Sequence, residues 1–331
     1  MAKPHMCDPQ LLQTDLSGKR YVVTGANSGI GFVTARQLAE QGAEVILACR
    51  KVDQGEARAA EIRAEHPTAK VEVRRLDLGD LASVAEFAHG VEADHQVLHG
   101  LINNAGVMNT PKSTTKDGFE MQFGVNHLGH FALTNLLLDL LQAADSARVV
   151  NVSSCFHDKA MGREGFIDLD DPNFERRDYD GWTAYAQSKL ANLLHARALA
   201  TRLEGTGVTA VSVHPGWVRT NLARHSMPVW VQNTIMRPLL RWSGMIEPWE
   251  GAQTTLFAAL DPSVAQHAGA FYSQLGVYRD KSCNKGGWPM RSPNPQAVDA
   301  DLPEQLWALS ERLLKGKLPG QGASDQLESV A

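Results

Sequence analysis

Short runs of β-forming residues alternate with segments of helical period along most of this 331-residue chain. The expected strands are residues 21–24, 45–48, 71–76, 98–102, 148–152, 208–213 and 270–272. The expected helices are residues 32–41, 53–65, 81–91, 119–141 and 182–203. This alternation is typical of βαβ units, which build a parallel sheet covered by helices on both faces. Several strands are apolar almost throughout, as expected when both of their faces are buried.

The pattern predicts one α/β domain, because no Pro-, Gly- or Ser-rich linker divides the chain and no repeat is visible. We expect residues 1–18 to form an N-terminal extension and residues 19–315 to form the domain. Residues 316–331 have the composition of loose chain and are expected to be a flexible tail. Within the domain, a lid over the substrate is expected around residues 221–250.

The first expected strand runs into a glycine-rich turn and then into a helix. The turn reads Gly25-Ala-Asn-Ser-Gly29-Ile-Gly31. Glycines let the backbone approach a pyrophosphate closely, and the free N–H groups of a helix N-terminus attract its negative charge. A tight turn without a ligand is the alternative, which the flanking strand and helix weaken. The predicted dinucleotide contacts in this turn are Gly25, Asn27, Ser28, Gly29, Ile30 and Gly31.

The end of the second expected strand distinguishes NADP(H) from NAD(H). Enzymes that use NAD place a carboxylate there for the ribose 2′-OH, whereas an arginine accommodates a 2′-phosphate. This chain reads Ala48-Cys49-Arg50-Lys51, with two cations and no acid. Solvated loop charges are the alternative interpretation. We favour NADP(H), bound by Arg50 and Lys51, over NAD(H).

Residues that follow three later strands complete the predicted cofactor site. A carboxylate at Asp77 can accept the adenine amino group, and small residues after the fourth strand allow close approach to the cofactor, although turn formation explains both segments equally well. The Thr220 hydroxyl and the backbone near Val218 can hold the nicotinamide carboxamide, whereas His214 is expected to be a packed loop residue. The predicted contacts in these segments are Asp77, Leu78, Asn104, Ala105, Gly106, Pro215, Gly216, Val218 and Thr220.

Tyr185 and Lys189 lie four residues apart in an expected helix, which places both side chains on one face. A phenol with an ordinary pKa of roughly 10 is a poor acid–base catalyst at neutral pH. A nearby ammonium, together with the positive charge of an oxidised nicotinamide, stabilises the phenolate and lowers that pKa. A Tyr/Lys pair on a helix is common by chance. It indicates catalysis only if the fold places it beside other site residues.

The expected positions of Ser154 and Asn126 support a catalytic role for the Tyr185/Lys189 pair. Ser154 follows the fifth strand, and active sites of open α/β sheets lie at the carboxyl edge of the strands. Its hydroxyl can polarise a substrate carbonyl. Asn126, within the expected helix 119–141, can reach a water that relays protons from Lys189, with a structural role as the alternative. No HExxH motif, carboxylate pair or Cys/His arrangement competes, so the sequence predicts no metal site.

Charge and composition restrict the classes of binding partner and the cellular setting that we expect. The formal net charge of -5, without a run of Lys/Arg, argues against nucleic acid. Four cysteines without CxxC spacing favour reduced thiols and a cytoplasmic setting. The N-terminal segment contains no apolar stretch long enough for a signal peptide or anchor, so we expect no integral membrane segment.

Together these segments resemble the short-chain dehydrogenase/reductase superfamily, in the family's order along the chain. The matching residues are Thr24-Gly25-x3-Gly29-x-Gly31, Asn103-Asn104-Ala105-Gly106, Asn126, Ser154, Tyr185-x3-Lys189 and Pro215-Gly216. The resemblance implies a Rossmann-type doubly wound parallel sheet in a single domain, and a homodimer or homotetramer. It implies that Tyr185 is the general acid/base and that Lys189 binds the nicotinamide ribose and lowers the tyrosine's pKa. It also implies that Ser154 orients the substrate and that Asn126 completes a proton relay.

Finer features are similar to the retinol dehydrogenase-like group of that superfamily. They are Leu47-Ala-Cys-Arg50, Gly124-Val-Asn-His-Leu-Gly-His130-Phe, Ser188-Lys-Leu-Ala-Asn192 and Gly251-Ala-Gln-Thr254. This resemblance implies an NADP(H)-preferring reductase of lipophilic aldehydes and ketones. Many such enzymes have an N-terminal membrane anchor, which we do not expect here. The segment 156–183 is longer than in compact members of the superfamily, which suits a pocket wall.

The substrate is expected to be a small lipophilic carbonyl compound or its alcohol. The expected lid contains the apolar residues Met227, Val229, Trp230, Ile235, Met236, Leu239, Leu240, Trp242, Met245 and Ile246. Such a surface suits a bulky apolar ligand, although a sheet-edge cover or a dimer contact explains it equally well. The alternatives are a light-dependent protochlorophyllide reductase-like or hydroxysteroid dehydrogenase-like reductase, and, outside catalysis, an NADP(H)-binding regulatory protein.

Overall fold

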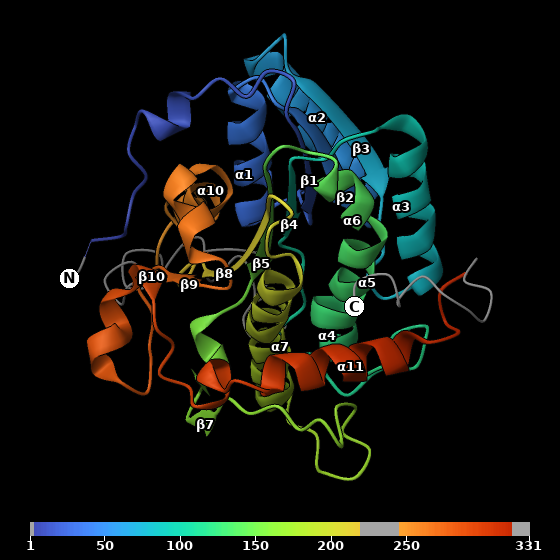
Figure 1. Ribbon diagram of the computed structural model, residues 1–331, viewed down its shortest axis with the longest axis vertical. Helices are drawn as coiled ribbons and strands as arrows, with labels where there is room; N and C mark the ends of the chain where they lie inside the picture. Colours follow the sequence, from blue (N-terminus) through green and yellow to red (C-terminus); the bar gives the residue numbers. More distant parts are fainter. Residues whose placement is uncertain (1–2, 219–244, 320–331) are drawn as a thin grey trace, which may run out of the picture.

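The computed structural model describes residues 3–218 and 245–319, built around an eight-stranded sheet (Figure 1). The strand order is β10-β9-β8-β5-β4-β1-β2-β3. Every neighbouring pair is parallel except β9 and β10, which pair antiparallel. The order runs outward in both directions from β1 and β4, which confirms a doubly wound α/β fold. The bounds are β1 (Arg20–Thr24), β2 (Glu44–Cys49), β3 (Lys70–Arg75), β4 (Gly100–Asn103), β5 (Ala147–Val152), β8 (Val208–His214), β9 (Phe271–Ser273) and β10 (Gly287–Met290).

Helices cover both faces of the sheet. One face packs against α1 (Gly29–Glu40), α2 (Val52–Glu65) and α10 (Pro248–Leu260). The other packs against α3 (Leu81–Asp94), α5 (Gly129–Leu136), α6 (Leu138–Gln142) and α7 (Gly181–Arg202). Helix α11 (Leu302–Leu314) crosses the outside of α7 (Figure 1). A small antiparallel hairpin, β6 (Lys159–Ala160) and β7 (Arg163–Glu164), lies apart from the sheet.

The central strands are mostly apolar because their successive side chains enter two different cores. Leu101 and Val149 belong to the cluster on the α3, α5 and α7 side. Their neighbours Ile102 and Val150 belong to the cluster on the α1 and α10 side. The alternating direction of strand side chains therefore explains the continuous hydrophobic runs of the sequence.

The helix predicted over residues 119–141 is present over residues 121–142, but it is not one regular α-helix. The helical chain begins as α4 (Met121–Phe123), where the Glu120 carboxylate accepts hydrogen bonds from the N–H groups of Gln122 and Phe123. A π-helical segment (Gly124–Leu128) follows before α5, and Leu137 separates α5 from α6. The helix also packs closely on the sheet edge, because a Cβ on Gly129 would lie 2.5 Å from the Leu78 carbonyl oxygen. The spacing of the apolar residues shows neither these contacts nor the interruptions. The sequence therefore predicted one helix.

Among the residues described after β8, the helices α10 and α11 and the strand β10 were not predicted. Helix α10 begins with a capping box between Glu247 and Glu250, so residues 248–250 belong to a helix rather than to the expected lid. Of that lid, only residues 245–250 lie within the described chain. Ile246 there forms a parallel bridge with Val218.

Both ends of the described chain are packed on the domain. The backbone N–H of Cys7 donates to Gln253 Oε1 at 3.0 Å, so the N-terminal extension lies against α10. Leu318 is buried and Lys317 donates to the Asp117 carbonyl, so the first residues of the expected tail are ordered contacts; residues 320–331 lie outside the described chain. None of the four cysteines forms a disulfide in the structure. Within the described ranges, no helix combines the length and hydrophobicity that crossing a bilayer would need.

Candidate active site

The predicted site residues that the structure describes gather at the carboxyl edge of the parallel strands. β1 ends at Thr24, β4 at Asn103, β5 at Val152 and β8 at His214. Each of these ends leads directly into one of the predicted segments. Thr220 lies outside the described residues. The strand order reverses between β1 and β4, where open α/β sheets bind ligands.

The glycine turn is held tightly against the loop after β4. Gly25 and Gly29 have φ of 66° and 57°, which favours glycine. A Cβ on Gly31 would lie 2.4 Å from Asn104 Nδ2 and 2.7 Å from the Gly25 carbonyl oxygen. Asn104 Nδ2 in turn donates to the Thr24 carbonyl at 2.7 Å. The absence of side chains at these positions therefore lets two backbone segments meet.

The N-terminus of α1 is open to an anion. Ser28 is its N-cap residue, and its hydroxyl makes no capping hydrogen bond. The N–H groups of the first turn, which include Ile30, are therefore available to a ligand and carry the positive end of the helix dipole. Asn27 Nδ2 donates to Gln54 Oε1 at 2.9 Å, which ties the turn to α2. This geometry fits a pyrophosphate.

Arg50 and Lys51 follow β2, and both side chains are exposed. Within the described chain neither is held in an ion pair. Asp77 Oδ1 accepts from the Gly79 N–H at 3.1 Å, so this carboxylate forms the local turn that was the alternative interpretation. Its neighbour Leu78 is buried. The structure thus leaves the two cations after β2 free for a 2′-phosphate.

Tyr185, Lys189 and Ser154 lie close together near the carboxyl ends of β4 and β5. Lys189 Nζ donates to the Val152 carbonyl at 2.9 Å and lies 5.7 Å from the centre of the Tyr185 ring. Ser154 interacts with the Tyr185 phenol, and its Oγ accepts from the Phe156 N–H at 3.2 Å. The three side chains are almost wholly buried.

Burial dominates the titration of this pair. It raises the pKa of the Tyr185 phenol well above its ordinary value, and the hydrogen bond with Ser154 opposes that effect. Burial lowers the pKa of the Lys189 ammonium to about 7. Both shifts arise because the charged form of each group loses hydration. Strongly shifted groups beside one another in a crevice are typical of a catalytic site.

Asn126 connects this group to the loop after β4. Its Oδ1 accepts from the Val107 N–H at 2.8 Å, and its Nδ2 donates to the Val107 carbonyl and to Ser188 Oγ, both at 2.9 Å. Ser188 Oγ donates to the Tyr185 carbonyl at 2.8 Å. A Cβ on Gly106 would lie 3.0 Å from Asn126 Oδ1 and 3.5 Å from Lys189 Nζ. Both amide protons of Asn126 are therefore already engaged.

An aromatic wall, Phe156 and Trp182, stands beside the phenol. Their rings meet edge-to-face with centroids 5.6 Å apart, and the Phe156 ring lies 6.2 Å from that of Tyr185. In the segment after β8, Pro215 is buried and Gly216 has φ of 92°. His214 is buried at the end of β8, as predicted for a packed residue.

Comparison with known proteins identifies this arrangement. The short chain dehydrogenase family model matches residues 19–164. Retinol dehydrogenase 13 from Homo sapiens is 42% identical over 92% of this chain and 87% of its own length. Retinol dehydrogenase 12 from Bos taurus is 46% identical over 90% of this chain and 87% of its own length. This chain belongs to the short-chain dehydrogenase/reductase superfamily. It is an oxidoreductase of the retinol dehydrogenase-like group, as its motifs predicted.

Solved structures of the superfamily share the fold. An uncharacterized protein from Mycobacterium Paratuberculosis is 38% identical, with a TM-score of 0.70 over 93% of this chain and 97% of the other. A protein described as an NAD(P)-dependent gluconate 5-dehydrogenase from Beutenbergia cavernae, with bound NADP, is 25% identical. Its TM-score is 0.62 over 78% of this chain and 96% of the other.

The sequence analysis assigned no role to the side chains that connect the separate motifs of this dehydrogenase by hydrogen bonds or ring contacts. Thr24 and His130 stood within quoted motifs without a role, although a buried hydroxyl and imidazole usually need partners. Ser188 was also quoted without a role. The pairing of Phe156 with Trp182 had no local signal, because only the fold brings the two rings together.

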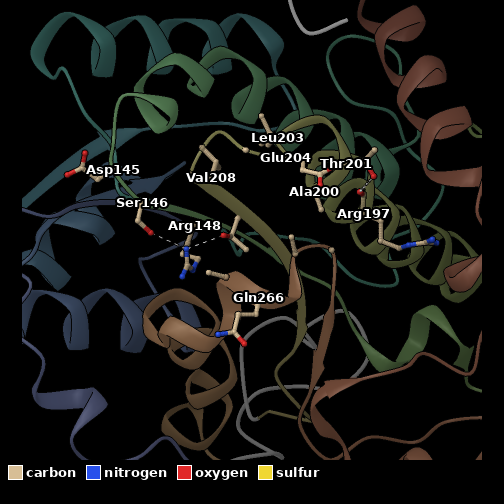
Figure 2. Close-up of a pocket in the computed structure, with 16 residues that line it drawn as sticks. Asp145, Ser146, Arg148, Arg197, Ala200, Thr201, Leu203, Glu204, Val208 and Gln266 are labelled. Carbon is tan, nitrogen blue, oxygen red and sulfur yellow. Dashed lines mark hydrogen bonds between the residues drawn. The ribbon is translucent and has the colours of Figure 1, made fainter.

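A separate cavity of about 750 Å³ lies at the opposite, amino-terminal edge of the dehydrogenase sheet. Arg148 reaches Ser146 and Thr209 there, across the starts of β5 and β8 (Figure 2). Asp145 and Glu204 line the same cavity, so it offers no single sign of charge. None of the predicted site residues lines it. Within the described ranges, no group of three or more His, Cys, Asp or Glu side chains is arranged to hold a metal ion.

Proposed function

We propose that this protein transfers a hydride between NADP(H) and a lipophilic aldehyde or ketone, or the corresponding alcohol. The convergence of Tyr185, Lys189 and Ser154 beside the open glycine turn carries the proposal. A regulatory protein that only bound the dinucleotide would have no need of a buried phenol, ammonium and hydroxyl together.

Several structural features of this chain suit the binding of NADP(H). The cradle of Gly25, Gly29 and Gly31 and the uncapped α1 N-terminus suit a pyrophosphate. Arg50 and Lys51 are exposed and form no ion pair with any residue that the structure describes, which suits a 2′-phosphate. NADP bound to the related structure from Beutenbergia cavernae supports the same choice.

The chain's own groups then have distinct tasks. When bound, the nicotinamide supplies or takes up the hydride. In reduction, Tyr185 gives its proton to the carbonyl oxygen as that oxygen gains negative charge. Ser154 donates a hydrogen bond to the same oxygen, and Lys189 stabilises the phenolate that remains. In oxidation the proton returns to the phenolate from the alcohol. Asn126 fixes the loop and helix that carry these groups.

A lipophilic substrate is supported by the aromatic wall and by the relatives' names. Phe156 and Trp182 are only partly buried, so the described structure leaves part of both rings accessible next to the phenol. Trp217, in the segment after β8, is 49% exposed. An apolar chain or ring bound against these aromatic rings would remove their surface from water.

A panel of substrates tests the proposed function directly. We expect oxidation of reduced nicotinamide, followed by its absorbance, with retinal-like and long-chain aldehydes and with NADPH in preference to NADH. Preference for small polar carbonyls would contradict the substrate class. No turnover with any carbonyl or alcohol, despite binding of NADPH, would favour the regulatory alternative.

The aromatic wall makes a second prediction. Phe156→Ala and Trp182→Ala should each lower kcat/KM for a long-chain aldehyde by about 3- to 10-fold, mostly through KM, because one aromatic contact is lost. A two-carbon aldehyde should lose little. Phe166→Ala is the matched control, since this ring is 48% exposed and lies outside the wall. Equal losses for short and long substrates would show that the wall does not select chain length.

The shifted pKa values predict opposite pH dependence for the two directions. The raised pKa of Tyr185 keeps the phenol protonated at neutral pH, the form that donates to a carbonyl. Reduction should therefore be fastest at low pH and fall as pH rises past the Lys189 pKa of about 7, where the ammonium is lost. Oxidation needs the phenolate and should rise with pH. Initial rates in both directions from about pH 6 to about pH 10 measure this, and oxidation that falls with pH would contradict it.

A further inference from the structure

We propose that His130 is a positioning residue that holds the 104–107 loop and Asn126 in one fixed arrangement for the cofactor. His130 lies on α5, one turn after Asn126, and is almost wholly buried. Its two ring nitrogens contact Thr24 at the end of β1 and Asn126 in the π-helical segment. The proposal deepens the proposed function, since these elements form the proposed cofactor site.

Hydrogen-bond counting fixes the direction of the contact with Thr24. Thr24 Oγ1 accepts from the N–H groups of Asn104 and Ala105, each at 2.9 Å. A hydroxyl oxygen has two lone pairs and one proton, so both lone pairs are used. The proton has two acceptors within reach, His130 Nε2 at 2.9 Å and the Ile102 carbonyl at 3.3 Å. The shorter contact makes Thr24 the donor and His130 Nε2 the acceptor.

That direction also fixes the tautomer of the imidazole. Because Nε2 accepts, the proton of the neutral ring is on Nδ1, which donates to the Asn126 carbonyl at 2.9 Å. Burial lowers the pKa of His130 to about 4, the Asn126 hydrogen bond opposes this, and the Lys189 charge adds to it, which is consistent with a neutral ring. Both nitrogens are therefore committed to fixed partners.

The two partners hold the same loop at its two ends. Thr24 binds the N–H groups of Asn104 and Ala105, and the Asn126 side chain binds both backbone groups of Val107. Gly106 lies between them, at the point where Asn126 and Lys189 approach. His130 joins the two attachments, so its loss should loosen the loop that faces the cofactor.

The two ring nitrogens are not equally replaceable. Without His130, Thr24 can turn its proton toward the Ile102 carbonyl. Among the described residues, no other side chain donates to the Asn126 carbonyl. The carbonyl also belongs to a π-helical turn, a geometry that recurs at functional sites. The Nδ1 donor should therefore matter more than the Nε2 acceptor.

Three variants separate these contributions. Asparagine places an amide N–H near the position of Nδ1, glutamine reaches the position of Nε2, and leucine supplies neither. We expect His130→Leu to weaken NADPH binding by about 10-fold, because the buried Asn126 carbonyl loses its side-chain donor. His130→Asn should recover most of the affinity, and His130→Gln little of it. KM for NADPH should rise more than kcat falls.

The measurements are NADPH titration by protein fluorescence without substrate, and deuterium exchange of the 104–107 loop in the cofactor-free protein. His127→Leu is the matched control: this histidine is also fully buried, but its Nε2 contacts Ser310 on α11 and not the loop. The control should lower Tm while leaving the NADPH affinity and the exchange of the loop unchanged.

Several outcomes would overturn the proposal. They are unchanged exchange in the 104–107 loop of His130→Leu, the same effects in His127→Leu, or no rescue by asparagine. The exchange experiment needs no cofactor and no turnover. If the wild-type protein bound no NADPH, the proposed function would fail while faster exchange in His130→Leu still supported the positioning role.

Discussion

Replacing Tyr185 with phenylalanine is expected to lower kcat by about a thousandfold or more while NADPH binding stays close to that of the wild type. The change removes only the hydroxyl, which is the group proposed to give a proton to the substrate oxygen. The ring remains buried against Phe156, so the fold should be retained. Lys189 keeps its contact with the Val152 carbonyl, which does not involve the phenol.

Single-turnover absorbance of bound NADPH, with a saturating aldehyde, measures this loss at the chemical step. Tyr21→Phe is the matched control, because Tyr21 is equally buried but lies in β1, near the amino-terminal edge of the sheet. Its kcat should stay within about twofold of the wild-type value. If the Tyr185→Phe protein kept a tenth of the wild-type rate, Tyr185 would not be the proton donor and the mechanism would fail.

The fold was predictable from the sequence because its strongest constraints are local. Buried parallel strands are apolar on both faces, so Val149 and Val150 marked β5 although they enter different cores. Glycine positions such as Gly31 marked a turn that no side chain fits. The helix expected over residues 119–141 is present over 121–142, but its π-helical segment and its interruption at Leu137 were not predicted, because neither changes the spacing of the apolar residues.

The residues of the site could be predicted from the sequence, but the hydrogen bonds that connect them could not. Tyr185, Lys189 and Ser154 were recognisable from spacing and position relative to strand ends. Asn126 was expected to reach a relay water, yet the structure shows its side chain engaged with Val107 and Ser188. Such long-range hydrogen bonds join segments that are not neighbours in the sequence. Most of the expected lid around residues 221–250 lies outside the described residues, so the proposed substrate wall depends on Phe156 and Trp182.

Reversing the charge of Arg50 should change which cofactor the enzyme prefers. Arg50→Glu replaces a cation placed for the 2′-phosphate with a carboxylate that repels it and can accept from a ribose 2′-OH. We expect KM for NADPH to rise by about 10- to 100-fold, while KM for NADH stays the same or falls. Initial rates with both cofactors and one aldehyde measure the change, and NADH serves as the internal control because it lacks the 2′-phosphate.

A matched surface variant separates this local effect from a change in net charge. Lys315→Glu alters the total charge by the same amount at the exposed C-terminal end of α11, which packs on α7 rather than on the strands that carry the glycine turn. It should leave both KM values unchanged. Because screening weakens long-range attraction, added salt should reduce the wild-type preference for NADPH and leave the Arg50→Glu preference nearly constant. Equal KM increases for NADPH and NADH in Arg50→Glu would mean that Arg50 supports the turn itself, and the assignment of the 2′-phosphate site would be wrong.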